Sequence, residues 1–213
     1  MALVAFDFDG TLSTDEMTVL LGEQCGVADE MRAITKQAMN DELDYAESLR
    51  RRVSLLDGLD GEAVQAAFEQ ISFRPGAVEL LTDLSRAGVK TAILTGGFVR
   101  GVRHALDAAD ASVDFIVANE LGVAEKQLTG DVSGPLVEGT KDVVLRAIST
   151  DLDVTLADTI AIGDGANDLP MLRAAGTSIG FKPKPAVRDA CDTTVTSMDE
   201  LRSVFVEQGI LTQ

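Results

Sequence analysis

Acidic side chains follow two apolar segments that lie far apart in the sequence. Asp7 and Asp9 end the stretch "LVAFDFDG", and Asp164 and Asp168 lie in "IGDGAND", after the apolar run "TIAI". Another acid, Glu16, follows the first pair in "TLSTDE". A carboxylate at the end of a buried strand is costly unless a cation or a chemical step makes use of it. The sequence therefore raises the question of what these acids do together.

Two further segments contain residue types that bind anions. Thr95, Gly96 and Gly97 follow the apolar run "KTAIL", and Lys141 stands in "EGTK", at the start of a helical pattern. In an open α/β sheet, ligands bind at the carboxyl ends of the strands. We therefore expect these segments and the two acidic ones to converge on one edge of a sheet, in a site with four acids, one lysine and several backbone amides.

Short apolar segments alternate with helical patterns along most of the chain. The segments predicted as buried strands span residues 2–8, 89–95, 114–118, 159–163 and 177–181. Apolar residues recur with helical spacing in "GAVELLTDLSRAG", "VRGVRHALDAA" and "TKDVVLRAI". This alternation predicts an α/β fold with a doubly wound, mostly parallel sheet and a Rossmann-like core.

One long stretch interrupts the alternation. Between Ser13 and about Phe73 no strand-like run occurs, and four segments have helical patterns: "DEMTVLLGEQCG", "ADEMRAITKQAMNDE", "DYAESLRRRVSLLDG" and "GEAVQAAFEQI". We expect residues 14–73 to form an inserted helical cap domain, and residues 1–13 and 74–213 to form the sheet domain. A smaller irregularity, "NELGVAEKQLTGDVSG", predicts a β-hairpin.

Composition argues against several kinds of partner. The chain has 35 acidic and 18 basic residues, a net charge of −17, and its acids are spread along its length. Such a surface disfavours nucleic acid and anionic membranes. The chain has no bilayer-length apolar run, no secretory signal and no CxxC pair between its two cysteines, so we expect a cytoplasmic protein with reduced thiols. Only six of the bases are lysines, and this acidic, lysine-poor composition suggests adaptation to high salt.

Four motifs in this order resemble those of the haloacid dehalogenase superfamily. They are "DFDGT" after the first strand, "TGG" after the second, the isolated Lys141, and "GDGAND" after the fourth. Each motif alone is common, but their order and strand contexts together are specific. Within the superfamily the chain is similar to the phosphoserine phosphatases over essentially its whole length, including "ITKQAMNDELDYAESLRRRVSLL", "LTGGF" and "LTGDV".

The resemblance implies a magnesium-dependent phosphatase that works through an aspartyl-phosphate. Asp7 would be the nucleophile, and Asp9 would protonate the leaving alcohol and later activate water. Mg²⁺, which prefers oxygen ligands, would be held by Asp7, the backbone carbonyl of Asp9 and Asp164. Asp168 would support the metal site from behind these ligands.

The resemblance also implies which groups bind phosphate. Thr95 and the backbone amide of Gly96 would bind phosphate oxygens, and Lys141 would balance the negative charge. Serine is common in the family at the position of Thr95. Since both residues carry one hydroxyl, we expect the activity to survive this difference.

The cap would select the substrate, O-phosphoserine, which carries an ammonium and a carboxylate on one carbon. An acid suits the first group and an arginine the second, and the resemblance assigns these roles to Glu16 and Arg52. The other arginines of "SLRRRVSL" would face solvent or form salt bridges. Asn167 would bind the substrate or phosphate region, and Met39 and Tyr45 would line a lid over the substrate. Relatives usually have phenylalanine at the position of Tyr45, so this chain adds a hydroxyl.

The leading interpretation is therefore a Mg²⁺-dependent phosphoserine phosphatase, which performs the last step of serine biosynthesis. Alternatives are the same chemistry on phosphohomoserine, phosphothreonine or another small phosphomonoester, and transfer of the phosphoryl group to a second alcohol. A catalytically inactive binding module is disfavoured because Asp7, Asp9 and Lys141 are all present. Nucleotide binding is disfavoured because the chain has no GxxxxGK[ST] motif and no GxGxxG after its first strand. The sequence leaves the oligomeric state open.

Overall fold

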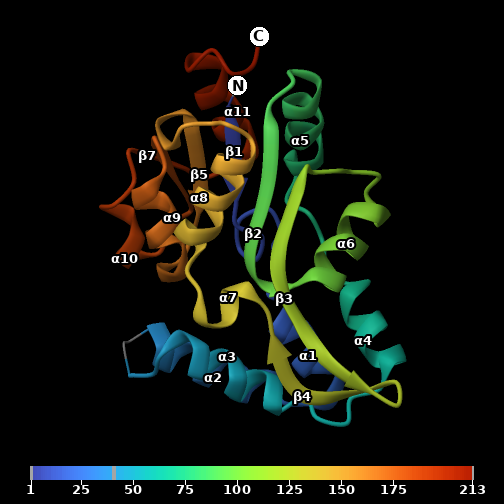
Figure 1. Cartoon of the computed structure of the whole chain (residues 1–213). Coiled ribbons are helices and arrows are strands. Elements are labelled where there is room, and N and C mark those ends of the chain that lie inside the picture. Colours follow the sequence, from blue (N-terminus) through green and yellow to red (C-terminus); the bar gives the residue numbers. More distant parts are fainter. Residues whose placement is uncertain (1, 40–41, 213) are drawn as a thin grey trace.

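A mostly parallel sheet, covered by helices on both faces, forms the larger part of the molecule (Figure 1). The computed structural model describes residues 2–39 and 42–212. The strands are β1 (Leu3–Phe6), β2 (Lys90–Phe98), β3 (Phe115–Ala124), β4 (Gln127–Ser133), β5 (Thr159–Gly163), β6 (Thr177–Phe181) and β7 (Thr193–Val195). Among the described residues they form one sheet in the order β4-β3-β2-β1-β5-β6-β7, in which only the β3–β4 pair is antiparallel.

The helices fall into a group around the sheet and a group beyond its edge. Around the sheet lie α5 (Ala77–Arg86), α6 (Val99–Ala108), α7 (Pro135–Glu138), α8 (Lys141–Asp151), α9 (Leu169–Ala174), α10 (Pro185–Arg188) and α11 (Met198–Glu207), with the 3₁₀ turns η1 (Leu156–Asp158) and η2 (Ala166–Asp168). Beyond the edge lie α1 (Met17–Cys25), α2 (Ala28–Met39), α3 (Tyr45–Ser54) and α4 (Gly61–Phe68). None of the described helices has the length and apolar content needed to cross a membrane.

β1 lies at the centre of the sheet because it is apolar on both faces. Phe6 pairs in register with Ile93 of β2 and with Ile162 of β5, and all four residues of β1 are buried. Its odd-numbered side chains join a core beneath α8 and α9, and its even-numbered side chains join the larger core beneath α5 and α11. A strand buried on both faces is typical of a parallel sheet. The carboxyl end of β1 points toward α1–α4 (Figure 1).

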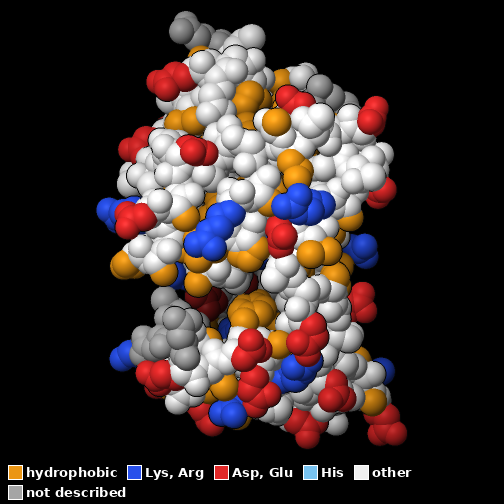
Figure 2. Space-filling model, turned by 60° about the vertical axis from the view of Figure 1, so that its left-hand side comes forward, with side chains coloured by type: hydrophobic (Ala, Val, Ile, Leu, Met, Phe, Trp, Pro, Cys, Tyr) orange, Lys and Arg blue, Asp and Glu red, His pale blue; other side chains and the backbone are white. Residues whose placement is uncertain are grey.

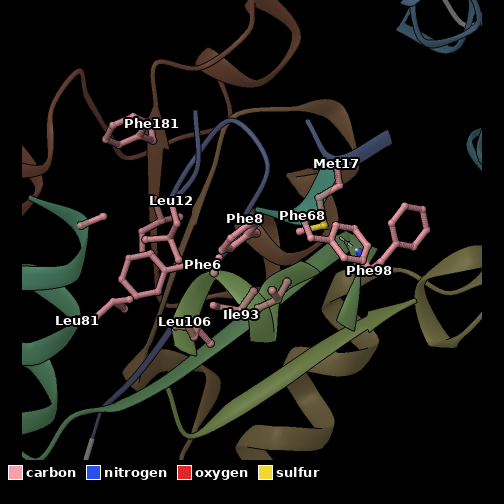
Figure 3. Packing of buried hydrophobic residues seen from close by; sticks show 14 of the residues in the cluster. Phe6, Phe8, Leu12, Met17, Phe68, Leu81, Ile93, Phe98, Leu106 and Phe181 are labelled. Atoms are coloured by element: carbon pink, nitrogen blue, oxygen red, sulfur yellow. Dashed lines mark hydrogen bonds between the residues drawn. The ribbon is translucent and has the colours of Figure 1, made fainter. Parts of the chain in front are cut away.

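The hydrophobic core continues from the sheet into the layer formed by α1–α4. Phe8 follows β1, and Met17 of α1, Phe68 of α4 and Phe98 at the end of β2 lie in the same buried cluster (Figure 3). The Met17 Sδ accepts a hydrogen bond of 3.4 Å from the Phe98 backbone N–H. This shared core packs α1 and α4 against the sheet.

The β3–β4 hairpin extends beyond the sheet and bonds to the segment between α3 and α4. The Gly58 N–H donates to the Leu128 carbonyl at 2.9 Å, and the Leu128 N–H donates to the Leu59 carbonyl at 2.8 Å. A third bond of 2.8 Å runs from the Gly61 N–H to the Lys126 carbonyl. The hairpin thus holds the segment between α3 and α4, and with it this end of the helical layer.

Most elements predicted from the sequence are present. The five predicted strands correspond to β1, β2, β3, β5 and β6, the predicted hairpin is β3–β4, and the four helical patterns of the interrupting stretch correspond to α1–α4. The short β7 was not predicted, and β2 and β3 are longer than predicted. The helix predicted through residues 28–42 includes Asn40 and Asp41, which lie outside the described residues. The division into a cap of residues 14–73 and a sheet domain remains a prediction.

Candidate active site

The end of β1 places Asp7 at the middle of the sheet's carboxyl edge. The Asp7 N–H donates to the Ile162 carbonyl at 2.8 Å, so the strand geometry continues one residue past β1. The chain then turns at Gly10, which has a φ of 85°. A Cβ on Gly10 would lie 2.7 Å from Oδ2 of Asp164, so the absence of a side chain lets this loop close against the second acidic segment.

Lys141, the first residue of α8, joins Asp7 to Asp168. Its Nζ lies 2.6 Å from Oδ1 of Asp7 and 2.5 Å from Oδ1 of Asp168, and all three side chains are buried. Burial alone would lower the pKa of Lys141, but the two carboxylates raise it above its ordinary value, so the ammonium stays charged. Burial, followed by the charge of Asp168, raises the pKa of Asp7 to about 7, against the opposing effect of Lys141.

Both carboxylate oxygens of Asp168 already have partners. Oδ1 binds Lys141, and Oδ2 accepts hydrogen bonds from the backbone N–H groups of Asp164 at 3.0 Å and Gly165 at 2.9 Å. Asp168 therefore fixes the lysine and the loop after β5, and it has little capacity left for another ligand.

The carboxylates of Asp7, Asp164 and Asp168 form a cluster that fits a metal ion. Each offers an oxygen, and these oxygens lie within 4.8 Å of one another. An all-oxygen donor set suits a hard divalent cation. Since both oxygens of Asp168 are used by its own hydrogen bonds, Asp7 and Asp164 are the acids of this cluster with capacity left to bind a cation. Asp164 also has an ion pair, because Nζ of Lys184 lies 3.0 Å from its Oδ2.

Asp9 differs from the other acids of the site because one of its oxygens is buried without a partner. Oδ1 is buried and makes no hydrogen bond within the described part of the chain. Burial, followed by the charges of Asp7 and Glu16, raises the pKa of Asp9 well above its ordinary value. Asp9 therefore keeps its proton to a higher pH than an ordinary aspartate does, and a protonated carboxyl that borders the cavity can donate a proton.

Thr95 lies in β2, as predicted, and the strand continues past it through Gly96 to Phe98, with a shift in register between β2 and β3 at this stretch. The Gly97 N–H donates to Oγ1 of Thr95 at 3.0 Å, which leaves the threonine O–H available as a donor. Asn119 of β3 holds this irregular stretch: its side chain donates to the Gly96 carbonyl at 3.1 Å and accepts from the Leu136 N–H at 3.0 Å. Asn119 was not among the residues predicted for the site, although it directly follows the predicted strand 114–118, and polar residues that follow a parallel strand are candidates for such a site.

A cavity of about 360 Å³ lies between the carboxyl edge of the sheet and the helical layer. Figure 2 shows the molecule hollowed where these two parts meet. The sheet side contributes the residues at the strand ends, namely Asp7, Asp9, Thr95, Gly96, Asp164 and Asn167. The helical layer contributes Glu16, Thr18, Tyr45, Ser48 and Arg52. Lys184, which the sequence analysis did not single out, also borders the cavity.

Arg52 is the arginine of α3 that faces the cavity. It is only 8% exposed, and its Nη1 donates to Oγ1 of Thr18 at 3.2 Å. Its neighbours point elsewhere, because Arg51 pairs with Glu47 at 2.7 Å and Arg50 pairs with Glu138. In the described part of the chain, no carboxylate forms an ion pair with Arg52, so a buried guanidinium stands beside the cavity without a counter-ion.

Glu16 borders the same cavity from the start of α1. It occupies the N-cap position, but its side chain makes no capping bond, and among the described residues it has no hydrogen bond or ion pair. A free carboxylate and a free guanidinium thus face one cavity whose floor holds Asp7.

Tyr45 and Asn167 lie where the main cavity meets a smaller one of about 190 Å³, which Lys141 also borders. Tyr45 is the first residue of α3, so the Asp44 side chain, which caps this helix, fixes its backbone. Met39 ends α2, and its side chain lies outside the described part of the structure. The expected place of Met39 in a lid therefore stays a prediction.

The chain matches known proteins over nearly its full length. The family model of the haloacid dehalogenase-like hydrolases matches residues 4–173. A phosphoserine phosphatase of Halobacterium salinarum is 50% identical over 210 residues, which cover 99% of this chain and 100% of the relative. A phosphoserine phosphatase of Methanocaldococcus jannaschii is 37% identical over 204 residues, with 95% of each chain covered.

Solved structures of phosphoserine phosphatases are also similar to this chain over nearly its full length. A phosphoserine phosphatase structure described as a phospho-aspartyl intermediate analogue superposes with a TM-score of 0.89 at 36% identity, covering 95% of this chain and 98% of the other. A substrate-bound phosphoserine phosphatase complex also has a TM-score of 0.89 at 36% identity, with 97% of both chains covered. The α/β fold with a mostly parallel sheet is thus shared with these structures.

Proposed function

The chain belongs to the haloacid dehalogenase-like hydrolases and, within them, to the phosphoserine phosphatases, and we propose that it hydrolyses O-phosphoserine to serine and phosphate through an aspartyl-phosphate on Asp7. This reaction would be the last step of serine biosynthesis, in the cytoplasm. The assignment of individual residues rests on the contacts around the cavity.

The observation that carries the choice of substrate is the unpaired guanidinium of Arg52. A buried charge is costly unless it is paired and hydrogen-bonded. Arg52 is 8% exposed, and among the described residues it has a threonine hydroxyl and a backbone carbonyl as partners but no carboxylate. The carboxylate of phosphoserine supplies the missing counter-ion.

Glu16 is the complementary group for the ammonium of the same substrate. It faces the cavity with Arg52, and neither has an ionic partner among the described residues. A ligand that carries an anion, a cation and a phosphate satisfies Arg52, Glu16 and the groups around Asp7 together. A sugar phosphate offers neither the carboxylate nor the ammonium.

The residues at the strand ends perform the chemistry. Asp7 attacks the phosphorus, and a bond forms between its carboxylate oxygen and the phosphoryl group as the bond to the serine oxygen breaks. Asp9, whose raised pKa favours its protonated form, gives its proton to the departing oxygen. Asp9 then accepts a proton from the water that hydrolyses the aspartyl-phosphate. Thr95 and the Gly96 amide hold the phosphoryl oxygens, and Lys141 keeps Asp7 in place.

Mg²⁺ fits the oxygen donors of Asp7 and Asp164, with Asp168 orienting the loop behind them. When bound, this cation lowers the repulsion between the carboxylate of Asp7 and an anionic phosphate. The backbone carbonyl of Asp9 completes the proposed set of protein ligands.

A substrate panel tests the proposal. The protein, with Mg²⁺, is assayed with O-phosphoserine, O-phosphoethanolamine, which lacks only the carboxylate, and 3-(phosphonooxy)propanoate, which lacks only the ammonium. We expect kcat/KM to be highest for phosphoserine and at least about tenfold lower for each of the other two, because each loses one charge-assisted hydrogen bond. Equal rates on all three compounds would refute the assignment of the substrate.

Two controls separate the substrate from the chemistry. Removal of the metal with a chelator should abolish hydrolysis of all three compounds, and added Mg²⁺ should restore it. Added Mg²⁺ should also raise the melting temperature of the chelator-treated protein, because a ligand that binds only the folded state stabilises it. Phosphohomoserine and phosphothreonine complete the panel, since they keep both charges and test how closely the cavity fits the serine carbon chain.

A further inference from the structure

The hydroxyl of Tyr45 lies directly against Gly96. A Cβ placed on Gly96 would come within 1.8 Å of the tyrosine oxygen and 3.1 Å of the ring carbon that carries it. The phenol therefore occupies the space that the missing side chain of Gly96 leaves open. A residue of the helical layer thus reaches across the cavity to the stretch of β2 that contains Thr95 and Gly96.

This hydroxyl is available as a hydrogen-bond donor. Among the described residues it has no hydrogen-bond partner. Burial is the main cause that raises the pKa of Tyr45 above its ordinary value, so the phenol keeps its proton throughout the neutral range. The charges of Lys141, Arg52 and Asp7 all act on it, so the phenol lies among the charged groups of the site.

The contact with Gly96 indicates which part of a ligand the hydroxyl meets. Under the proposed function, on which this inference rests, the Gly96 amide and the Thr95 hydroxyl bind phosphoryl oxygens. A donor in contact with Gly96 stands beside those oxygens. Arg52 and Glu16 are the groups proposed for the carboxylate and the ammonium at the other end of the substrate.

We propose that the Tyr45 hydroxyl donates a hydrogen bond to a phosphoryl oxygen of the substrate and so adds a donor from the helical layer to the phosphate-binding groups of the sheet. Charge spreads over the phosphoryl oxygens during transfer, so an extra donor at this place stabilises the transition state as well as bound phosphate.

The Tyr45→Phe variant tests the proposal, because it removes the phenol oxygen and keeps the ring. We expect the affinity for inorganic phosphate, measured by calorimetry on the Mg²⁺-loaded protein, to fall about tenfold, the effect of losing one hydrogen bond to a charged group. The value of kcat/KM should fall by a similar factor on phosphoserine and on p-nitrophenyl phosphate, which share only the phosphoryl group. Inhibition by L-serine should stay unchanged.

Thr35→Val is the matched control. Thr35 borders the same cavity from α2, but its hydroxyl already donates to the Met31 carbonyl at 3.0 Å, so its loss should leave phosphate affinity unchanged. Unchanged phosphate affinity in Tyr45→Phe would overturn the proposal. A loss confined to phosphoserine, with weaker serine inhibition, would also overturn it, because the hydroxyl would then bind the amino-acid end. If the wild-type protein did not prefer phosphoserine, the proposed function would fail, while phosphate binding would still decide the role of Tyr45.

Discussion

The Nζ of Lys141 lies 2.6 Å from Oδ1 of Asp7, and this ion pair is almost completely buried. The same ammonium binds Asp168 at 2.5 Å, so a single cation compensates two carboxylates beneath the cavity. Its removal would leave both acids without a counter-ion in a place from which water is excluded.

Lys141→Met should therefore damage stability and activity together. Breaking a buried ion pair by removing one partner costs about 3–5 kcal/mol, so we expect the free energy of unfolding to fall by about 3 kcal/mol. Phosphatase activity should fall by at least about a thousandfold, because the position of Asp7 and the charge balance at the phosphoryl group are lost together. Chemical denaturation and a phosphate-release assay measure the two effects. Lys36→Met, at an exposed site on α2, is the control and should change neither quantity.

Arg52→Met should change specificity without destabilising the fold. Because Arg52 has no acidic partner among the described residues, its removal leaves no carboxylate unpaired. We expect kcat/KM to fall about a hundredfold on phosphoserine and to change little on phosphoethanolamine, which lacks the carboxylate that Arg52 would bind. The melting temperature should stay the same or rise. Arg51→Met, which removes a surface partner of Glu47, is the control. Equal losses on both substrates would contradict the role of Arg52.

Gly96→Ala should be harmful because of Tyr45. The added Cβ would lie 1.8 Å from the phenol oxygen, so the ring must move away from the phosphoryl site. In the double variant with Tyr45→Phe the closest atom becomes the ring carbon at 3.1 Å, which small shifts can relieve. We expect the two substitutions to be non-additive, with a coupling of about 1 kcal/mol or more in a double-mutant cycle of kcat/KM. Additive effects would show that a side chain at position 96 does not displace the Tyr45 ring.

Asp114 should make stability depend on pH in the acid range. Partial burial alone would raise the pKa of Asp114, but hydrogen bonds from Lys90 and from the Thr91 backbone lower it below its usual value. A carboxyl with a lowered folded-state pKa stabilises the protein above its unfolded pKa, and this contribution is lost as the pH falls through the folded value. Asp114→Asn should thus cost about 0.5 kcal/mol near pH 7, and the cost should shrink steadily as the pH falls below the ordinary pKa of an aspartate. Urea titrations across this range measure the difference, with the exposed Asp57→Asn as the control.

The net charge of −17 should make the fold depend on salt. The Debye length falls from about 10 Å at 0.1 M salt to about 3 Å at 1 M, so repulsion among surface acids weakens over this range. We expect the melting temperature to rise by at least about 4 °C between 0.1 and 2 M KCl, equivalent to about 1–2 kcal/mol for a chain of this size. A melting temperature that is the same at both concentrations would contradict adaptation to salt.

The sequence predicted which residues meet at the site, but it did not predict the contacts that hold the surrounding elements in place. Asp7, Lys141 and Asp164 follow or begin regular elements, and the topology of a parallel sheet brings such positions to one edge. The bonds between Leu128 and the Gly58–Leu59 segment are formed by backbone groups, which leave no mark in the side-chain pattern.

Two other features could not be predicted: one element is very short, and one contact joins residues that lie far apart in the sequence. β7 has three residues, fewer than a periodic pattern needs to be visible. The contact between Tyr45 and Gly96 joins residues from different layers, and its existence depends on how α3 is placed over the sheet. Local preferences determine elements, but the distance between two elements depends on packing across the whole core.

The hydrogen bonds between the β3–β4 hairpin and the segment after α3 affect how this protein can be engineered. Helices α1–α4 are contiguous in the chain, which suggests that this segment could be replaced as a unit by the corresponding helices of a protein with a different specificity. If residues 14–73 were transplanted onto a core with a shorter hairpin, the Gly58 and Gly61 N–H groups would lose their acceptors and the Leu59 carbonyl its donor. A functional chimera therefore has to carry two segments, the helices and the tip of the hairpin, which are separated by about fifty residues of the chain.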